Sequence, residues 1–170
     1  MMLERRGSLR GTKVAFVGDG NNVANSLSAL AAHCGMHFTL ACPEGCGQPP
    51  GFLAKVAELC RSSGGSCREV RDPGEAVRDA DVIYTDVWIS MGEESLAEEK
   101  KKRFAGYQVN EALLAAAPEH CLVTHCLPAH LGEEITPEVM ASPRCVCFDE
   151  AENRLHAQKA VLLRLIRESS

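Results

Sequence analysis

The chain has 170 residues, 45% of them hydrophobic, and 18 Lys and Arg against 23 Asp and Glu give it a formal net charge of −5. This length suits one domain, and the acidic balance argues against nucleic-acid binding, because phosphate backbones are held by clustered basic residues. No apolar stretch approaches the roughly 20 residues of a membrane helix, and the charged N-terminus is no secretion signal. We therefore expect a cytoplasmic protein with no membrane or nucleic-acid partner.

The nine cysteines indicate a reducing compartment. Their number is odd, and most of them lie in apolar runs, where a free thiol packs as a small hydrophobic group. Two close pairs occur, Cys42 with Cys46 and Cys145 with Cys147. Neither pair has the second pair or the His spacing of a zinc site, so we expect no metal.

Short apolar or β-branched runs alternate with longer segments of helical character. Strands are predicted at residues 13–18, 37–42, 66–70, 81–85, 121–125 and 145–148. Helices are predicted at residues 22–34, 52–62, 75–79, 93–104, 110–117 and 152–168. This alternation predicts an α/β domain, three-layered and Rossmann-like, with a mainly parallel sheet. The first ten residues have little apolar surface, and we expect a cut linker or helix there.

Polar residues follow four of the predicted strands, where ligands of open α/β sheets collect. They are Asp19, Asn21 and Asn22 after the first strand, Asp86, Ser90 and Met91 after the fourth, His125 and Cys126 after the fifth, and Asp149, Glu150, Asn153 and Arg154 after the sixth. Amides, carboxylates, a thiol and a guanidinium at one edge indicate a site for a small, polar, charged molecule.

The turn after the first strand resembles a dinucleotide fingerprint only in part. Gly18 and Gly20 are present, but Val23 stands at the third glycine position, and the second strand ends without a ribose-binding acid. Adjacent amides at a helix start suit a zwitterion better, because an amide both donates and accepts hydrogen bonds. For Asn21 alone, capping of the helix is the simpler interpretation.

The fourth strand is followed by a carboxylate and a loop with large apolar residues. Asp86 either anchors an amine in the ligand crevice or caps the loop. Trp88 and Ile89 indicate a loop that closes over a ligand, although Trp88 alternatively packs on the edge of the sheet.

The last two candidates are a thiol and a guanidinium. His125 and Cys126 are neighbours on a strand and point to opposite faces, which disfavours a Cys/His hydrolase. Cys126 therefore either positions an amine or packs in the core. Arg154 lies in the first helical turn, where the dipole disfavours a cation, which indicates anion binding. Its alternative is a salt bridge to Glu150 or Asp149.

Four segments resemble, in order and spacing, the motifs of the ornithine carbamoyltransferase family: residues 17–22, 86–92, 125–128 and 148–154. The resemblance runs from about residue 9 to residue 167, and the His-Cys-Leu-Pro segment and the Ser-Met-Gly loop resemble the ornithine enzyme rather than its aspartate, acetylornithine or putrescine relatives. It implies an ornithine-binding domain at residues 11–170 after a truncated connector at residues 1–10. The carbamoyl-phosphate-binding domain is expected to be absent, because no Ser-Thr-Arg-Thr-type motif occurs.

The resemblance also implies roles for individual residues. Asn22, Asp86, Ser90 and Met91 would hold the α-amino and α-carboxylate end of L-ornithine, and Cys126 with the Leu127 carbonyl would position its side-chain amine. Arg154 would reach carbamoyl phosphate, so Cys126 and Arg154 would be the catalytic residues. The amine would attack the carbamoyl carbon, giving citrulline and phosphate in arginine metabolism, with no metal or cofactor.

The resemblance further implies a homotrimer assembled through the missing half, so we expect the isolated chain to be monomeric or weakly associated. Because the carbamoyl-phosphate-binding half is missing, we also expect this domain alone to be inactive. Two alternatives stay open. One is a non-catalytic amino-acid-binding or regulatory module derived from that enzyme, and the other is a nucleotide-binding Rossmann domain.

Overall fold

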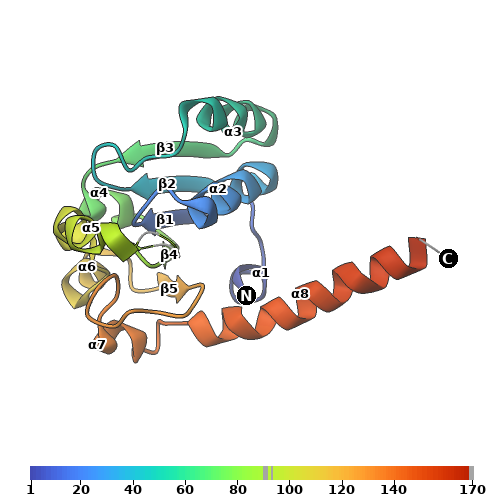
Figure 1. Cartoon of the computed structure of the whole chain (residues 1–170). Helices are drawn as coiled ribbons and strands as arrows, with labels where there is room; N and C mark the ends of the chain where they lie inside the picture. Colours follow the sequence, from blue (N-terminus) through green and yellow to red (C-terminus); the bar gives the residue numbers. More distant parts are fainter. Residues whose placement is uncertain (90–91, 93, 169–170) are drawn as a thin grey trace.

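The computed structural model describes residues 1–89, 92 and 94–168 and is built around one parallel sheet (Figure 1). The sheet contains β1 (Lys13–Val17), β2 (His37–Ala41), β3 (Ser66–Val70), β4 (Val82–Thr85) and β5 (Leu122–His125). Their order is β3-β2-β1-β4-β5, and every pairing is parallel. The predicted α/β fold with a parallel sheet is confirmed.

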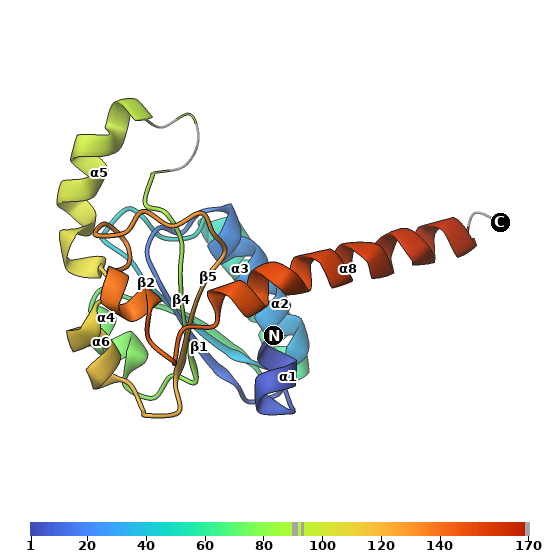
Figure 2. The same ribbon diagram turned by 90° about the horizontal axis from the view of Figure 1, so that it is seen from below.

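Helices connect the strands and cover both faces of the sheet, which gives the predicted three layers (Figures 1 and 2). They are α1 (Met2–Arg6), α2 (Asn22–Cys34), α3 (Pro50–Ser63), α4 (Pro73–Val77), α5 (Ala97–Phe104), α6 (Glu111–Ala116), α7 (Pro137–Met140) and α8 (Cys147–Glu168), with 3-10 turns η1 (Glu94–Leu96) and η2 (Ala105–Tyr107). The helix predicted at residues 22–34 has the predicted bounds. Its start is fixed by Asn21, whose side chain accepts the amide protons of Val23 and Ala24.

The central strand β1 is buried on both of its faces. Ala15 and Val17 pack into the core under α4, α6 and α7, whereas Val14 and Phe16 pack into the core under α2. Strands covered on both sides appear in the sequence as continuous apolar runs rather than as alternating patterns. This is why residues 13–18 could be assigned to a strand by their apolar character alone.

The prediction of a sixth strand at residues 145–148 is wrong. Cys145 forms only an isolated bridge with Val123, and α8 begins at Cys147, five residues before the predicted helix. The backbone amide of Val146 bonds to Val123, and its carbonyl already accepts the Glu150 amide of the helix. Acidic residues in this first turn, Asp149 and Glu150, favour a helix start because they face the positive end of the helix dipole.

Helix α8 projects away from the rest of the molecule (Figures 1 and 2). Of its residues Cys147 is buried, whereas Leu155, Val161, Leu162 and Leu163 are all more than half exposed. Within the first ten residues, Met2–Arg6 form α1, which contacts the start of α8 through the ion pair of Arg5 with Asp149. No helix among the described residues is both long and apolar enough to cross a bilayer.

Candidate functional site

A cleft of about 450 Å³ opens at the carboxyl ends of β1, β4 and β5. Its position is the point where the strand order changes direction, since the chain proceeds from β1 through β2 to β3 on one side and from β4 to β5 on the other. The cleft is lined by Asn22, Val23, Asp86, Val87, Ile89, Cys126, Leu127, Pro128 and His130. Four predicted site residues therefore share one cavity: Asn22, Asp86, Cys126 and Leu127.

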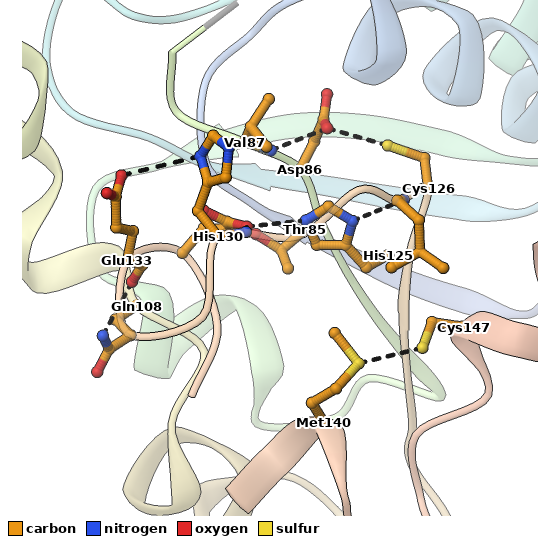
Figure 3. Close-up of polar contacts among 12 residues, drawn as sticks. Thr85, Asp86, Val87, Gln108, His125, Cys126, His130, Glu133, Met140 and Cys147 are labelled. Carbon is orange, nitrogen blue, oxygen red and sulfur yellow. Dashed lines mark hydrogen bonds and ion pairs between the residues drawn. The ribbon is translucent and has the colours of Figure 1, made fainter. Parts of the chain in front are cut away.

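Asp86 is the electrostatic centre of this cleft. Only 7% of its surface is exposed, and its carboxylate accepts three hydrogen bonds. The donors are the side-chain amide of Asn21 at 2.9 Å, the backbone amide of Val87 at 2.8 Å and the thiol of Cys126 at 2.9 Å. All three donors are uncharged, so the negative charge remains available for a cationic ligand. Figure 3 shows Asp86 between Val87 and Cys126.

Cys126 is half-buried and its thiol is a proton donor. Burial raises the pKa of Cys126 well above its ordinary value, and the neighbouring Asp86 carboxylate raises it further by accepting the thiol proton and by its charge. A thiol with a raised pKa is a poor nucleophile, because the thiolate is the reactive form. The geometry therefore supports a positioning role for Cys126 rather than covalent catalysis.

We expect iodoacetamide to modify Cys126 slowly at pH 8, and to modify it faster in Asp86→Asn. Removing the carboxylate charge lowers the pKa of the thiol, and the thiolate fraction at a given pH then rises. Mass spectrometry of peptides taken during the labelling reaction measures the rate for each cysteine. Equal rates for Cys126 in the two proteins would contradict the assigned contact, and Cys34 serves as an internal control in both.

His125 and Glu134 form a buried pair directly beneath the cleft. Neither side chain is exposed to solvent, and His125 Nε2 lies 3.1 Å from Glu134 Oε1. The other ring nitrogen, Nδ1, accepts the backbone amide proton of Leu127 at 2.8 Å, so Nε2 carries the proton and donates to the carboxylate. Glu134 also accepts the backbone amide of His130 at 2.6 Å.

This pair holds the backbone that follows β5. Leu127 has a φ of 56°, in the left-handed region that non-glycine residues seldom adopt, and the next peptide bond, to Pro128, is cis. The hydrogen bond from the Leu127 amide to His125 stabilises this conformation. Glu134 was missed in the sequence because it lies in a loop nine residues beyond His125, and only its complete burial distinguishes it from Glu133.

We expect Glu134→Ala to lower the free energy of unfolding by about 2–4 kcal/mol, because it leaves the His125 and His130 donors buried and unpaired. In a chain of this size that corresponds to a fall in Tm of roughly 5–15 °C. Thermal denaturation followed by circular dichroism measures the change. Glu133→Ala is the matched control, since Glu133 pairs with Lys101 at the surface. A similar loss in both variants would contradict the buried role of Glu134.

The glycine-rich turn after β1 is explained by packing. A Cβ atom on Gly20 would lie 2.6 Å from the Gly47 backbone and 2.8 Å from the Cys46 carbonyl oxygen. The Gly20 amide also donates to that carbonyl at 2.8 Å, which ties the turn to the loop after β2. Asn21 caps α2, as expected, while Asn22 is exposed and lines the cleft.

The polar residues at the start of α8 do not reach the cleft, contrary to the sequence prediction. Glu150 accepts hydrogen bonds from the hydroxyls of Tyr84 and Thr124, and Asn153 donates to Glu4 of α1. Arg154 is exposed and makes no hydrogen bond or ion pair with any described residue, so the alternative interpretation, a salt bridge to Glu150 or Asp149, is not observed in that part of the chain. Because α8 begins at Cys147, Glu150 lies in its first turn and contacts side chains of β4 and β5 rather than the cleft.

The loop after β4 is described only in part. Ser90 and Met91, two of the predicted site residues, lie outside the described residues. Trp88 is buried and stacks on Phe104 of α5, with ring centroids 5.8 Å apart. For Trp88, the packing alternative is therefore the correct one, and Ile89 lines the cleft.

Asp86, His125 and Cys126 place potential metal ligands within 4.8 Å of one another. Both ring nitrogens of His125 are engaged, one with Glu134 and the other with the Leu127 amide. The Cys126 thiol retains its proton in the contact with Asp86. A metal ion would have to break these three contacts. The arrangement instead favours a ligand that donates hydrogen bonds to the Asp86 carboxylate and the Cys126 sulfur and leaves the three contacts intact.

Comparison with known proteins places this chain in a family. The family model for the aspartate/ornithine carbamoyltransferase Asp/Orn binding domain matches residues 10–165. An ornithine carbamoyltransferase of Acidothermus cellulolyticus is 50% identical over 163 residues, which cover 96% of this chain and 52% of that relative. One of Gloeobacter violaceus is 51% identical over 163 residues, again 52% of the relative. The chain thus spans about half the length of the curated relatives that it matches.

Solved structures agree with the sequence matches. The crystal structure of ornithine carbamoyltransferase from Gloeobacter violaceus superposes with a TM-score of 0.85 at 49% identity, covering 95% of this chain and 53% of that one. The ornithine carbamoyltransferase structure from Pyrococcus furiosus superposes with a TM-score of 0.90 at 49% identity, covering 95% of this chain and 51% of that one. The resemblance seen in the motifs therefore extends to the fold.

Proposed function

Since the chain belongs to the aspartate/ornithine carbamoyltransferase family through its Asp/Orn binding domain, we propose that its cleft binds L-ornithine for carbamoyl transfer. The observation that carries this proposal is the convergence of the buried Asp86 carboxylate, the Asn22 amide, the Cys126 thiol and the Leu127 backbone in one cleft. A zwitterion with a second amine needs both an anionic anchor and neutral hydrogen-bonding groups.

In this proposal the two ends of ornithine have separate partners. Asn22 and Asp86, together with Ser90 and Met91, hold the α-amino and α-carboxylate end. The Cys126 sulfur and the Leu127 carbonyl oxygen accept from the side-chain amine. The Cys126 proton is directed to Asp86, so the sulfur presents a lone pair to the amine. The His125 to Glu134 pair supports this placement by holding the Leu127 backbone.

The reaction needs the side-chain amine in its neutral form. An alkylammonium has a pKa of about 10.4, so it must give one proton to solvent before nitrogen can attack the carbamoyl carbon. The new C–N bond gives a tetrahedral intermediate, the bond from its carbon to the phosphate oxygen breaks, and a second proton from the nitrogen leaves with the phosphate, which gives citrulline. The residues of this chain would contribute orientation of the amine, an effect that can supply several kcal/mol of the barrier reduction.

Carbamoyl phosphate would be held mainly by the part of the relatives that this chain does not span, hereafter the complementary half. We propose that residues 1–10 connect to that half, that residues 11–170 form the ornithine-binding domain, and that Arg154 turns toward carbamoyl phosphate when the two halves are joined. The exposed position of Arg154 on α8 and the neighbouring exposed Leu155 and Leu162 support this placement. Assembly into trimers would likewise depend on the complementary half.

The test uses this chain alone and this chain joined to the complementary half of the Gloeobacter violaceus relative, hereafter the joined protein. Citrulline formation from carbamoyl phosphate and L-ornithine is measured for both, with Asp86→Ala as the control for contaminating host enzyme. We expect activity only in the joined protein. A folded joined protein that binds carbamoyl phosphate and forms no citrulline would overturn the proposal. Activity of the chain alone would contradict the proposal that the complementary half is needed to hold carbamoyl phosphate.

We expect the backbone amides of residues 155–164 in α8 to exchange with deuterium within seconds in the chain alone and to be protected at least tenfold in the joined protein. Their apolar side chains pack against no core in the chain alone, and an isolated helix of this length is marginally stable in water. Exchange read by mass spectrometry measures the difference, with peptides of the buried β1 as the internal standard. Equal exchange in the two proteins would contradict the proposed docking of α8.

A further inference from the structure

Three sulfur atoms from three neighbouring segments meet where α8 leaves the body of the molecule. Cys147 Sγ lies 3.2 Å from Met140 Sδ and 3.5 Å from Cys145 Sγ, and Cys145 Sγ lies 3.8 Å from Met140 Sδ. Both cysteines are free thiols. We propose that this group of sulfurs, hereafter the sulfur cluster, binds one soft monovalent cation, Cu(I). The cluster is separate from the cleft, and the proposal does not rest on the proposed function. It revises the expectation that Cys145 and Cys147 bind no metal, because Met140 supplies a third sulfur that the spacing of the pair does not show.

The fold brings the three sulfurs together from separate elements. Met140 is the last residue of α7, Cys147 is the first residue of α8, and Cys145 is bridged to Val123 of β5. Figure 3 shows the Met140 and Cys147 side chains pointing toward each other, apart from Asp86 and Cys126. Cys147 is buried, whereas Cys145 and Met140 are half-buried. The cluster is therefore shielded from bulk water and can still be reached by an ion.

The ligand set selects the metal. Thiolate and thioether sulfur are soft ligands and prefer Cu(I) to hard cations such as magnesium or calcium, which take oxygen ligands. A metal–thiolate bond of about 2.3 Å places the sulfurs of a three-coordinate site about 4.0 Å apart. The sulfurs here lie 3.2–3.8 Å apart, so binding requires each to move outward by a few tenths of an ångström.

Binding exchanges two protons for one metal ion. The two S–H bonds break, two Cu–thiolate bonds and one bond from copper to the Met140 thioether form, both protons go to solvent, and no electrons are transferred. The charge of the bound cation drives the loss of both protons, because a coordinating thiol is deprotonated by the metal. The site with metal carries one net negative charge at the N-terminus of α8, where the helix dipole stabilises it.

The other close cysteine pair offers a contrast. Cys42 Sγ lies 3.1 Å from the guanidinium nitrogen Nη1 of Arg71, and this fixed positive charge opposes binding of a cation. Cys42 and Cys46 are both buried, like Cys147, so replacing them perturbs packing to a similar degree. The double variant Cys42→Ala/Cys46→Ala is therefore a matched control for Cys145→Ala/Cys147→Ala.

The experiment is an anaerobic titration of the 170-residue chain with Cu(I), supplied as its acetonitrile complex in competition with bathocuproine disulfonate. We expect the wild-type chain and Cys42→Ala/Cys46→Ala to retain one equivalent of Cu(I) with the same affinity. Affinity should fall at least about 100-fold in Cys145→Ala/Cys147→Ala and about 10-fold in Met140→Leu. Retention by Cys145→Ala/Cys147→Ala at wild-type affinity, or an equal loss in the control double variant, overturns the proposal.

A second measurement does not depend on the folding of any variant. X-ray absorption at the copper edge of the wild-type chain should show a shell of sulfur scatterers at about 2.3 Å. In the wild-type chain labelled with selenomethionine, the selenium edge should show a copper neighbour. A copper shell of nitrogen or oxygen, or a selenium edge without copper, overturns the proposal.

Discussion

Replacing Asp86 by Asn should raise the Kd of the joined protein for L-ornithine by roughly 30- to 150-fold, the loss of about 2–3 kcal/mol expected for a hydrogen bond to a charged group. Asp86 is 7% exposed, and its three observed donors are uncharged, so little else in the cleft offsets a ligand ammonium. Asparagine has the same shape and can still accept from the Val87 amide. Calorimetric titration in the presence of carbamoyl phosphate measures the change.

The control for this variant is Asp79→Asn. Asp79 is exposed and pairs with Lys13 at 2.6 Å, at the opposite end of β1 from the cleft. It changes the net charge equally, and we expect its Kd for L-ornithine to stay within twofold of the unsubstituted joined protein. If Asp86→Asn also stays within threefold of that protein while retaining its Tm, Asp86 is not the ammonium anchor.

Replacing Cys126 by Ala should lower kcat of the joined protein about 100-fold with a much smaller effect on KM. The sulfur would orient the attacking amine, and a misplacement of about 1 Å at the reacting atoms costs on the order of 100-fold in rate. Cys126→Ser should lose only about tenfold in kcat, because a hydroxyl still donates to Asp86 and still offers a lone pair. Steady-state rates of citrulline formation measure both variants.

The ranking of the two Cys126 variants separates positioning from covalent catalysis. A covalent nucleophile whose thiolate is essential would lose similar activity in the Ser and Ala variants. Cys34→Ala is the control, since Cys34 is half-buried at the end of α2, away from the cleft lining. A Cys126→Ala variant with unchanged kcat would contradict the assigned role.

The sequence predicted the sheet well because its strands carry local signals. Residues 66–70 have the predicted bounds, and Asn21 caps α2 as expected. The prediction of a strand at residues 145–148 was wrong because an apolar run of this length is compatible with either structure. The single bridge of Cys145 to β5 and the acidic first turn of α8 decide in favour of the helix.

The cleft could be predicted only in part. Asn22, Asp86, Cys126 and Leu127 directly follow strands or begin helices, so the topology alone brings them to one edge. Glu134 depends on the path of a loop that has no periodic pattern. The direction of Arg154 depends on where α8 begins, and helix ends are the least certain part of a sequence prediction.

The position of β1 in the middle of the sheet has a consequence for folding kinetics. Val14 pairs with Phe38 on one side and with Val82 on the other. The first pairing closes a short stretch of chain, whereas the second must close a much longer one, at a higher entropic cost and a slower rate. We therefore expect strands β1, β2 and β3 to pair early in folding and strands β4 and β5 to join the sheet later. The cleft would then be among the last parts of the molecule to acquire its native shape.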